Sequence, residues 1–161
     1  MFERLRPGTG RQERGFTLFE LMVVVLIIAI LIAIAIPTFL GARQRAQDRA
    51  AQSNVRNALT AEKTFYTDAQ VYSQQTADLT AIEPSLSYTN AAGSMAATGN
   101  IVYIQVYGTP ATTVVVGAQS GSGKCFWARD TTGSPGTQYL QTDTPCSGSA
   151  PDENTAMSST W

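Results

Sequence analysis

The sequence predicts an α+β protein in which a long N-terminal α-helix packs on a small antiparallel β-sheet. Three observations lead to this prediction. Residues 16–36 are an apolar run with one charge, and the segment after them keeps an apolar stripe at helical spacing. The C-terminal half instead holds short β-branched runs between glycine-rich turns, together with two cysteines. The parts that we expect are a basic leader over 1–15, an apolar helix over 16–42, its amphipathic half over 43–66 and an outer domain over 67–161.

Composition excludes most enzymatic chemistry. The chain has 161 residues, enough for one ordinary domain, and only 14% are charged against about 25% in a typical soluble domain. It contains no histidine, which removes histidine-based triads and histidine-ligated zinc. Two cysteines cannot complete a four-cysteine zinc site. We therefore expect no enzyme, no cofactor and no metal, and the net charge of -1 argues against a nucleic-acid-binding domain.

The apolar run is long enough to cross a membrane as a helix. At about 1.5 Å per residue, its 21 residues would span about 31 Å, the thickness of a bilayer core. A secretory signal peptide fits badly, because the run exceeds the about 7–15 residues of a signal core and no small-residue cleavage site follows it. The leader is cationic, which predicts an N-terminus in the cytoplasm. Its charges are Arg4, Arg6, Arg11 and Arg14 against Glu3 and Glu13.

Glu20 is the one charge in the run, and two explanations are open. A carboxylate at the centre of a spanning helix costs about 2–3 kcal/mol, so such residues usually face a protein partner. Near the end of the helix it would instead lie among the lipid headgroups, close to the positive end of the helix dipole, at little cost.

The stretch RGFTLFE at residues 14–20, followed at once by the apolar run, resembles the class III signal of type IV pilins. The resemblance is dense over residues 14–40. It implies that a membrane-embedded prepilin peptidase cuts between Gly15 and Phe16 and methylates the new amino terminus of Phe16. It also implies that Glu20 is the family's glutamate and that Pro37 is its proline near the end of the apolar helix.

Cleavage at this site would keep the apolar helix on the mature protein. The helix could anchor the subunit in the membrane first and pack against copies of itself afterwards. The new amine of one subunit can pair with Glu20 of its neighbour, and the pair would set the register because a shifted subunit would bury an unpaired carboxylate. Pro37 should kink the helix and free the backbone carbonyl near Ala33.

An amphipathic pattern continues the helix to about Tyr66. Arg45, Arg49 and Arg56 lie within about 40° of one another on one face, at about 100° per residue. This face is either a contact with acidic headgroups or with neighbouring subunits, or an ordinary solvated face. The apolar stripe on another face consists of Ala51, Val55, Ala58, Leu59 and Tyr66.

Residues 67–99 show no sustained period and predict a surface loop with one short helix or strand at most. We expect the strands beyond them to form an antiparallel meander with one face buried against the helix. The tail after residue 146 is weakly structured by composition, although Trp161 could dock. The expected strands are 101–107 and 112–116, which form a hairpin, then 125–129 and 137–141.

Cys125 and Cys146 would enclose a 22-residue loop with little apolar core of its own. A disulfide would stabilise it by about 3 kcal/mol through loop entropy, and an extracytoplasmic location permits one. The alternative is two unpaired thiols. In many pilins a C-terminal disulfide closes a variable loop, and this pair resembles it.

Two other motifs predict no site. Residues 121–124 (GSGK) lack the earlier glycine and the Ser or Thr of a phosphate-binding loop, so they predict a hairpin turn. The acids of the outer domain lack the spacing of a calcium loop.

The resemblance implies a structural subunit of a type IV pilus filament, made as a prepilin in the cytoplasmic membrane and assembled into an extracellular pilus. The implied partners are copies of itself, the prepilin peptidase, membrane lipid before assembly, and the platform protein and ATPase of the assembly machinery. The alternatives are a pseudopilin of a type II secretion system and a minor or DNA-uptake pilin. Nucleic acid is disfavoured because, from Thr64 onward, only Lys124 and Arg129 oppose seven acids.

Overall fold

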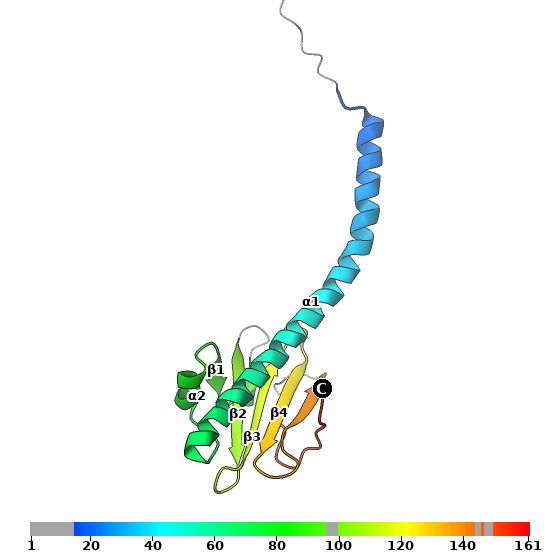
Figure 1. Ribbon diagram of the computed structural model, residues 1–161. Helices are drawn as coiled ribbons and strands as arrows, with labels where there is room; N and C mark the ends of the chain where they lie inside the picture. The colour runs from blue at the N-terminus through cyan, green and yellow to red at the C-terminus, as the bar shows by residue number, and fades with distance from the viewer. Residues whose placement is uncertain (1–14, 96–99, 144–145, 147–149) are drawn as a thin grey trace, which may run out of the picture. The chain divides into compact units, whose positions relative to one another are not determined.

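The computed structural model describes residues 15–95, 100–143, 146 and 150–161. The fold is α+β, as predicted, and the chain forms two compact units, Met1–Leu40 and Gly41–Trp161, with the long helix contributing to both (Figure 1). In chain order the elements are α1 (Leu18–Ala69), α2 (Thr76–Ile82), β1 (Ser87–Thr89), the 3-10 turn η1 (Ala92–Ser94), β2 (Ile101–Tyr107), β3 (Thr113–Gln119), β4 (Cys125–Thr131) and β5 (Gln138–Thr142).

In the second unit, α1 lies across one face of the sheet, as Figure 1 shows. The predicted stripe makes this contact: Val55 and Ala58 are completely buried, Ala51 and Leu59 nearly so, and Tyr66 partly. These residues fall at helical spacing, so a single face of α1 supplies the core. Burial of this face, rather than helix propensity alone, stabilises the second half of α1.

The helix ends at Ala69 because the next residue leaves helical geometry. Gln70 has φ 56°, in the left-handed region, and its N–H donates to the carbonyl of Tyr66 at 2.9 Å. This is the usual way to close a helix, although glycine commonly occupies the position. The chain then turns back toward the sheet.

The sheet has the strand order β1-β2-β3-β4-β5, and β2 to β5 form the predicted antiparallel meander. The turn between β3 and β4 contains GSGK, with the Ser120 N–H donating to the carbonyl of Lys124 at 2.8 Å, so the hairpin prediction is confirmed. β1 was not predicted: it pairs parallel to β2 over three positions. Residues 67–99 were expected to hold one short element at most, but α2, β1 and η1 all lie there, each too short to show a period.

The predicted burial of the sheet face against the helix is confirmed, and the opposite face is buried as well, which was not predicted. Side chains alternate along β3, with Val114 and Val116 packed toward α1 and Val115 on the opposite face. That opposite face has its own core, because the polypeptide beyond β5 and the segment before β2 cover it. The second core holds Met95, Tyr103, Val115, Cys125, Trp127 and Cys146, with Ala150 and Met157 packed against it.

Gly117 makes room for the largest side chain of this second core. It pairs with Trp127 across β3 and β4, and a side-chain carbon added at Gly117 would overlap the six-membered ring of Trp127. Trp127 is 3% exposed and its ring meets Tyr103 edge-on, with centroids 5.9 Å apart. The indole therefore has no free space into which to move.

We expect Gly117→Ala to destabilise the protein by about 1–3 kcal/mol, because the added methyl forces the Trp127 ring out of its packing. Denaturant unfolding of the full chain in detergent, followed by tryptophan fluorescence, measures this. Gly133→Ala is the matched control, since nothing lies within 4 Å of a carbon added there. Equal stability of the two variants would contradict the packing role.

Candidate functional site

α1 begins with a capping box formed by Thr17 and Glu20. The backbone N–H of Glu20 donates to Thr17 Oγ1 at 3.1 Å, and the backbone N–H of Thr17 donates to Glu20 Oε2 at 3.0 Å. The Thr17 hydroxyl also donates to Oε2, at 3.0 Å. Two N–H groups that a helix start leaves without partners are thereby satisfied. This box was not predicted, although Thr-x-x-Glu before an apolar run is its signature.

The capping box leaves one oxygen of Glu20 unused. Both bonds from Thr17 go to Oε2, and no described residue donates to Oε1. Glu20 lies on the exposed surface of the helix. The carboxylate therefore orders the start of its own helix and keeps an oxygen that an external cation can bind.

Gly15 and Phe16 precede the helix in an open stretch of chain. Phe16 is 80% exposed, and nothing lies within 4 Å of a carbon added at Gly15. The backbone between them is uncrowded, as an approaching enzyme requires. Cleavage and methylation at these two residues stay predictions, and so does the role of Glu20 in register.

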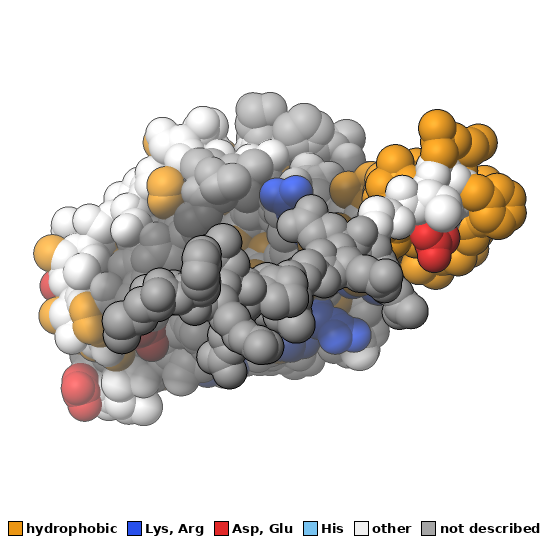
Figure 2. Space-filling view, turned by 90° about the horizontal axis from the view of Figure 1, so that it is seen from above, with side chains coloured by type: hydrophobic (Ala, Val, Ile, Leu, Met, Phe, Trp, Pro, Cys, Tyr) orange, Lys and Arg blue, Asp and Glu red, His pale blue; other side chains and the backbone are white. Residues whose placement is uncertain are grey.

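The first half of α1 exposes apolar side chains on every side. Its large hydrophobic residues range from 37% exposed at Val23 to 75% at Leu18, and no residue in its most apolar stretch of 18 residues is buried. Figure 2 shows this part of the helix covered by hydrophobic side chains. Among the described residues, α1 is the one helix that is both long enough and apolar enough to cross a membrane. A helix that is apolar all round is normally covered by lipid or by protein.

Pro37 lies inside α1, and the helix continues through it. Next to it, the hydroxyl of Thr38 donates to the carbonyls of Ile34 and Ala35, at 3.2 and 2.9 Å. Proline removes one helical N–H, and back-bonding of this kind often bends a helix. The kink at Pro37 stays a prediction.

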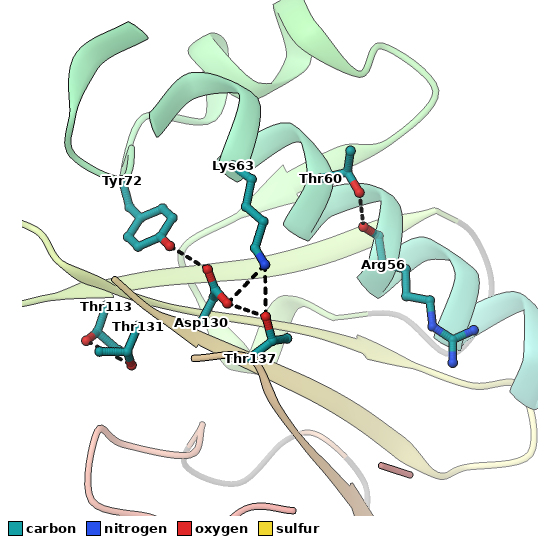
Figure 3. Close-up of polar contacts among 8 residues, drawn as sticks. All are labelled: Arg56, Thr60, Lys63, Tyr72, Thr113, Asp130, Thr131 and Thr137. Carbon is teal, nitrogen blue, oxygen red and sulfur yellow. Dashed lines mark hydrogen bonds and ion pairs between the residues drawn. The ribbon is translucent and has the colours of Figure 1, made fainter. Parts of the chain in front are cut away.

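A polar cluster joins the C-terminal part of α1 to β4 (Figure 3). Asp130 on β4 accepts a hydrogen bond from the Tyr72 hydroxyl at 2.6 Å. It also forms an ion pair with Lys63 Nζ at 3.1 Å. Lys63 also donates to Thr137 Oγ1 at 2.8 Å, and Thr137 in turn donates to Asp130. Burial and the neighbouring carboxylate raise the pKa of Tyr72, which keeps it a neutral donor. All these groups are bonded to one another, so the cluster fixes structure and offers no free acid or base.

Glu62 is the most deeply buried charged residue described, at 0% exposure. Its Oε2 accepts the backbone N–H of Ser73 at 3.0 Å, and its Oε1 has no hydrogen-bond partner. Burial raises the pKa of the Glu62 carboxyl from 4.5 to about 7; the Ser73 N–H opposes this shift and the Asp78 carboxylate adds to it. Glu62 therefore holds the chain that follows α1, and at neutral pH it is partly protonated.

The predicted disulfide is confirmed. Cys125 on β4 and Cys146 are bonded, with Cα atoms 5.6 Å apart, and both are buried. The bond fixes the polypeptide beyond β5 against the second face of the sheet. Most of the loop between β5 and residue 150 lies outside the described residues.

Trp161 docks, as expected from the sequence. Its Nε1–H donates to the carbonyl of Trp127 at 3.2 Å, and its ring meets Phe126 edge-on with centroids 5.8 Å apart. The guanidinium of Arg56 lies 4.7 Å above the same ring, a cation–π contact. Of the three arginines on the predicted basic face, Arg56 is therefore engaged within its own chain.

No metal site is evident in the described part of the chain, which contains no group of three or more Cys, Asp or Glu residues able to hold an ion. The features that remain for function are the capped apolar helix and the surface around it. The capped helix defines a class of protein: one in which a helix apolar enough to cross a membrane continues into a folded sheet domain.

Comparison with known proteins identifies the family. Residues 10–36 match the prokaryotic N-terminal methylation motif. The type IV wide pilus major component PilA4 of Thermus thermophilus is 31% identical over 113 residues, which cover 70% of this chain and 86% of that protein. The type IV major pilin protein PilA of Myxococcus xanthus is 47% identical over 62 residues, but these span only 28% of its length and 38% of this chain. The type II secretion system core protein G of Dickeya chrysanthemi is 38% identical over 45 residues, 28% of this chain and 29% of that protein.

The chain belongs to the type IV pilin family. The matched segments include the methylation motif, in which Gly15, Phe16 and Glu20 lie. The family is one of structural proteins, which agrees with the chemistry of the sites described above.

We expect Glu62→Gln to remove a pH dependence of stability. The folded-state pKa is raised, so the native protein binds more protons than the unfolded chain between about pH 4.5 and 7, and its stability falls as the pH rises through this window. At pH 8 the variant should be more stable than the parent by about 3 kcal/mol, and near pH 4.5 the two should agree.

The measurement is the free energy of unfolding of the full chain in detergent, compared between parent and variant at each pH. Glu153→Gln is the control, because Glu153 is exposed. If the free energies of unfolding of the parent and of Glu62→Gln differ by the same amount at every pH, the pKa of Glu62 is not raised in the folded protein.

Proposed function

We propose that the protein is the structural subunit of a type IV pilus, made as a prepilin and polymerised through the apolar half of α1. One observation carries the proposal: residues 18–40 present large apolar side chains on all sides of a helix that starts with its own cap. Such a surface is stable only where water is excluded. In this proposal a bilayer covers it before assembly, and copies of the same helix cover it afterwards.

Moving from lipid to filament is feasible because a helix satisfies its own backbone. Backbone N–H and C=O groups inside α1 pair within the helix, except where Pro37 supplies no N–H, so few backbone bonds have to change when the surroundings change. Lipid tails and neighbouring apolar helices are comparable solvents for leucine and isoleucine side chains. The transfer therefore depends on packing and on the few polar groups at the two ends of the apolar segment.

Processing would supply the cation that Glu20 lacks. Before cleavage the nitrogen of Phe16 belongs to an uncharged peptide bond, and after cleavage between Gly15 and Phe16 it is a charged amine, which keeps its charge when methylated. We infer that this amine binds Glu20 of a neighbouring subunit, through the oxygen that Thr17 leaves free. Pairing then cannot precede processing, so an unprocessed subunit would not enter the filament in register.

The outer unit would remain outside the cytoplasm, with the leader on the cytoplasmic side. Its disulfide suits an oxidising compartment. The cationic leader favours this orientation. The prepilin peptidase, the platform protein and the assembly ATPase are the partners that this route requires.

A pseudopilin of a type II secretion system is the second candidate. The similarity to core protein G of two secretion systems supports it. Both candidates use the same anchor and the same assembly step, and they differ in the length of the polymer. Electron microscopy of cells beside a deletion strain separates them: long surface filaments that disappear with the deletion support the pilus, and their persistence contradicts it.

Mass spectrometry of the mature protein should find an N-terminal, methylated Phe16. The expected mass is that of the chain without residues 1–15, with one methyl group added and two hydrogens missing for the disulfide. A control strain without prepilin peptidase should keep the leader. An N-terminus at Met1, or one produced by cleavage after Ala42, would overturn the proposal.

We expect Glu20→Gln to be processed normally and to fail to enter filaments. Glutamine at this position can still accept the Thr17 N–H, so the capping box survives while the charge is lost. Thr17→Ala is the matched control: it weakens the cap by about 1 kcal/mol but keeps the carboxylate, and it should still assemble. Filament yield in sheared fractions is the readout, and normal filaments from Glu20→Gln would disprove the charge-pairing role.

A further inference from the structure

Three arginines follow the apolar segment, and no acid among the described residues forms an ion pair with them. Arg43, Arg45 and Arg49 are exposed, and none makes a hydrogen bond or ion pair through its side chain to another described residue. The ion pairs among the described residues involve Lys63 and Lys124 instead. Like charges four residues apart on a helix repel each other, as Arg45 and Arg49 do.

The nearest acid does not neutralise them. Asp48 accepts a hydrogen bond from the Ser120 hydroxyl at 2.6 Å and another from Ser122, so it is committed to the turn between β3 and β4. The three guanidinium groups therefore present a net positive charge around this part of α1. An anionic surface outside the chain would be attracted to it.

The side chain of Arg45 points back toward the apolar segment. Its Nη1 lies 3.6 Å from the place where a carbon added at Gly41 would stand. Helical side chains lean toward the N-terminus, and here the missing side chain of Gly41 leaves room for the guanidinium. The charge of Arg45 thus lies beside Gly41, the residue directly after Leu40.

The three arginines also lie close to the level at which a membrane core would end. Arg43 follows Leu40 by three residues, which span about 11 Å at most in any backbone conformation and about 4.5 Å in a helix. The headgroup layer on each side of a bilayer core is about 5–8 Å thick. If the apolar segment ends in the core near Leu40, Arg43 and Arg45 follow it by about 4.5 and 7.5 Å of helix and fall within the headgroup layer. Arg49 follows by about 13.5 Å of helix, beyond that layer, and reaches it only because long side chains of a helix lean toward its N-terminus.

The charges are distributed around the helix rather than on one face. At about 100° per residue, Arg43 lies about 160° from Arg45 and about 120° from Arg49. A single protein partner would touch one side of α1, whereas a bilayer surrounds it. Guanidinium groups bind phosphate oxygens in pairs, so phospholipid phosphates match both the charge and its arrangement.

We propose that Arg43, Arg45 and Arg49 form a collar that binds anionic phospholipid headgroups while the subunit waits in the membrane. The proposal rests on the membrane-resident stage of the proposed function and names the lipid class that this stage requires. Assembly must break these contacts, so the anionic lipid content of the leaflet on the outer-unit side would set how readily a subunit is extracted.

Arg56 provides a matched control within the same helix. It is also an arginine and lies on the same face of α1 as Arg45 and Arg49. It is about 24 Å along the helix from Leu40, however, and therefore well beyond the headgroup layer. Its guanidinium is already engaged over the Trp161 ring. Removing its charge should leave lipid binding unchanged.

The test uses the full chain in nanodiscs of equal phosphatidylglycerol and phosphatidylcholine, with retained lipids counted by native mass spectrometry. Each arginine near an anionic membrane surface stabilises binding by about 1 kcal/mol, which is about fivefold in affinity. We expect the parent protein and Arg56→Gln to retain at least about five times as much phosphatidylglycerol as phosphatidylcholine. The triple variant Arg43→Gln/Arg45→Gln/Arg49→Gln should retain both lipids equally, and high salt should reduce the preference of the parent.

Equal retention of the two lipids by the parent, or an unchanged preference in the triple variant, would overturn the collar. So would an equal loss of preference in Arg56→Gln. A triple variant that keeps its lipid preference but no longer forms filaments would assign the arginines to contacts between subunits instead. The measurement needs no filament, so the collar can be disproved while the pilus proposal stands. The collar can also be confirmed if the protein turns out to be membrane-anchored but not a pilus subunit.

Discussion

The apolar surface of α1 between Phe16 and Leu40 is the constraint on which the other features of this protein depend. Nothing in the described chain covers it, and its large side chains remain half exposed or more at most positions. An uncovered surface of this kind needs a partner that excludes water. The outer unit needs no such partner, because it buries its own core on both faces of the sheet and closes its C-terminal loop with a disulfide.

This division separates two kinds of stability within one helix. From Ala51 onward α1 is held by side chains that pack on β2, β3 and β4, and changes there act on the folding of a single chain. Before Gly41 no described residue covers its apolar side chains, so under the proposed function changes there act on insertion and on polymerisation. The polar groups at the two limits of the apolar segment, Glu20 and the arginines from Arg43, therefore have the greatest influence on where the segment resides.

The sequence allowed the main elements to be predicted because their patterns are long or repetitive. The apolar stripe from Ala51 to Leu59 extends over two helical turns, and the strands from β2 to β5 are separated by clear turns. β1 has only three residues and pairs parallel, so its partner β2 becomes evident only in three dimensions. Burial of the second sheet face depended on where the polypeptide after Cys146 goes, which no local pattern encodes. Glu62 lies within the apolar stripe, four residues after Ala58 and seven after Val55, so helical spacing alone indicates its burial. Its hydrogen-bond partner, the N–H of Ser73, depends on the loop that folds over it and could not be predicted.

The capping box is compatible with both explanations for Glu20 that the sequence left open. A carboxylate near the start of a helix is stabilised by the helix dipole, and here it also accepts hydrogen bonds from Thr17. Both effects lower the cost of holding the charge at a membrane surface without any partner protein. The second oxygen remains able to bind a cation, and in a filament core, where water is excluded, that bond becomes stronger while an unpaired charge becomes costlier. In the proposed function, one residue is therefore tolerated in the lipid-bound subunit and still selective in the polymer, because the two environments differ.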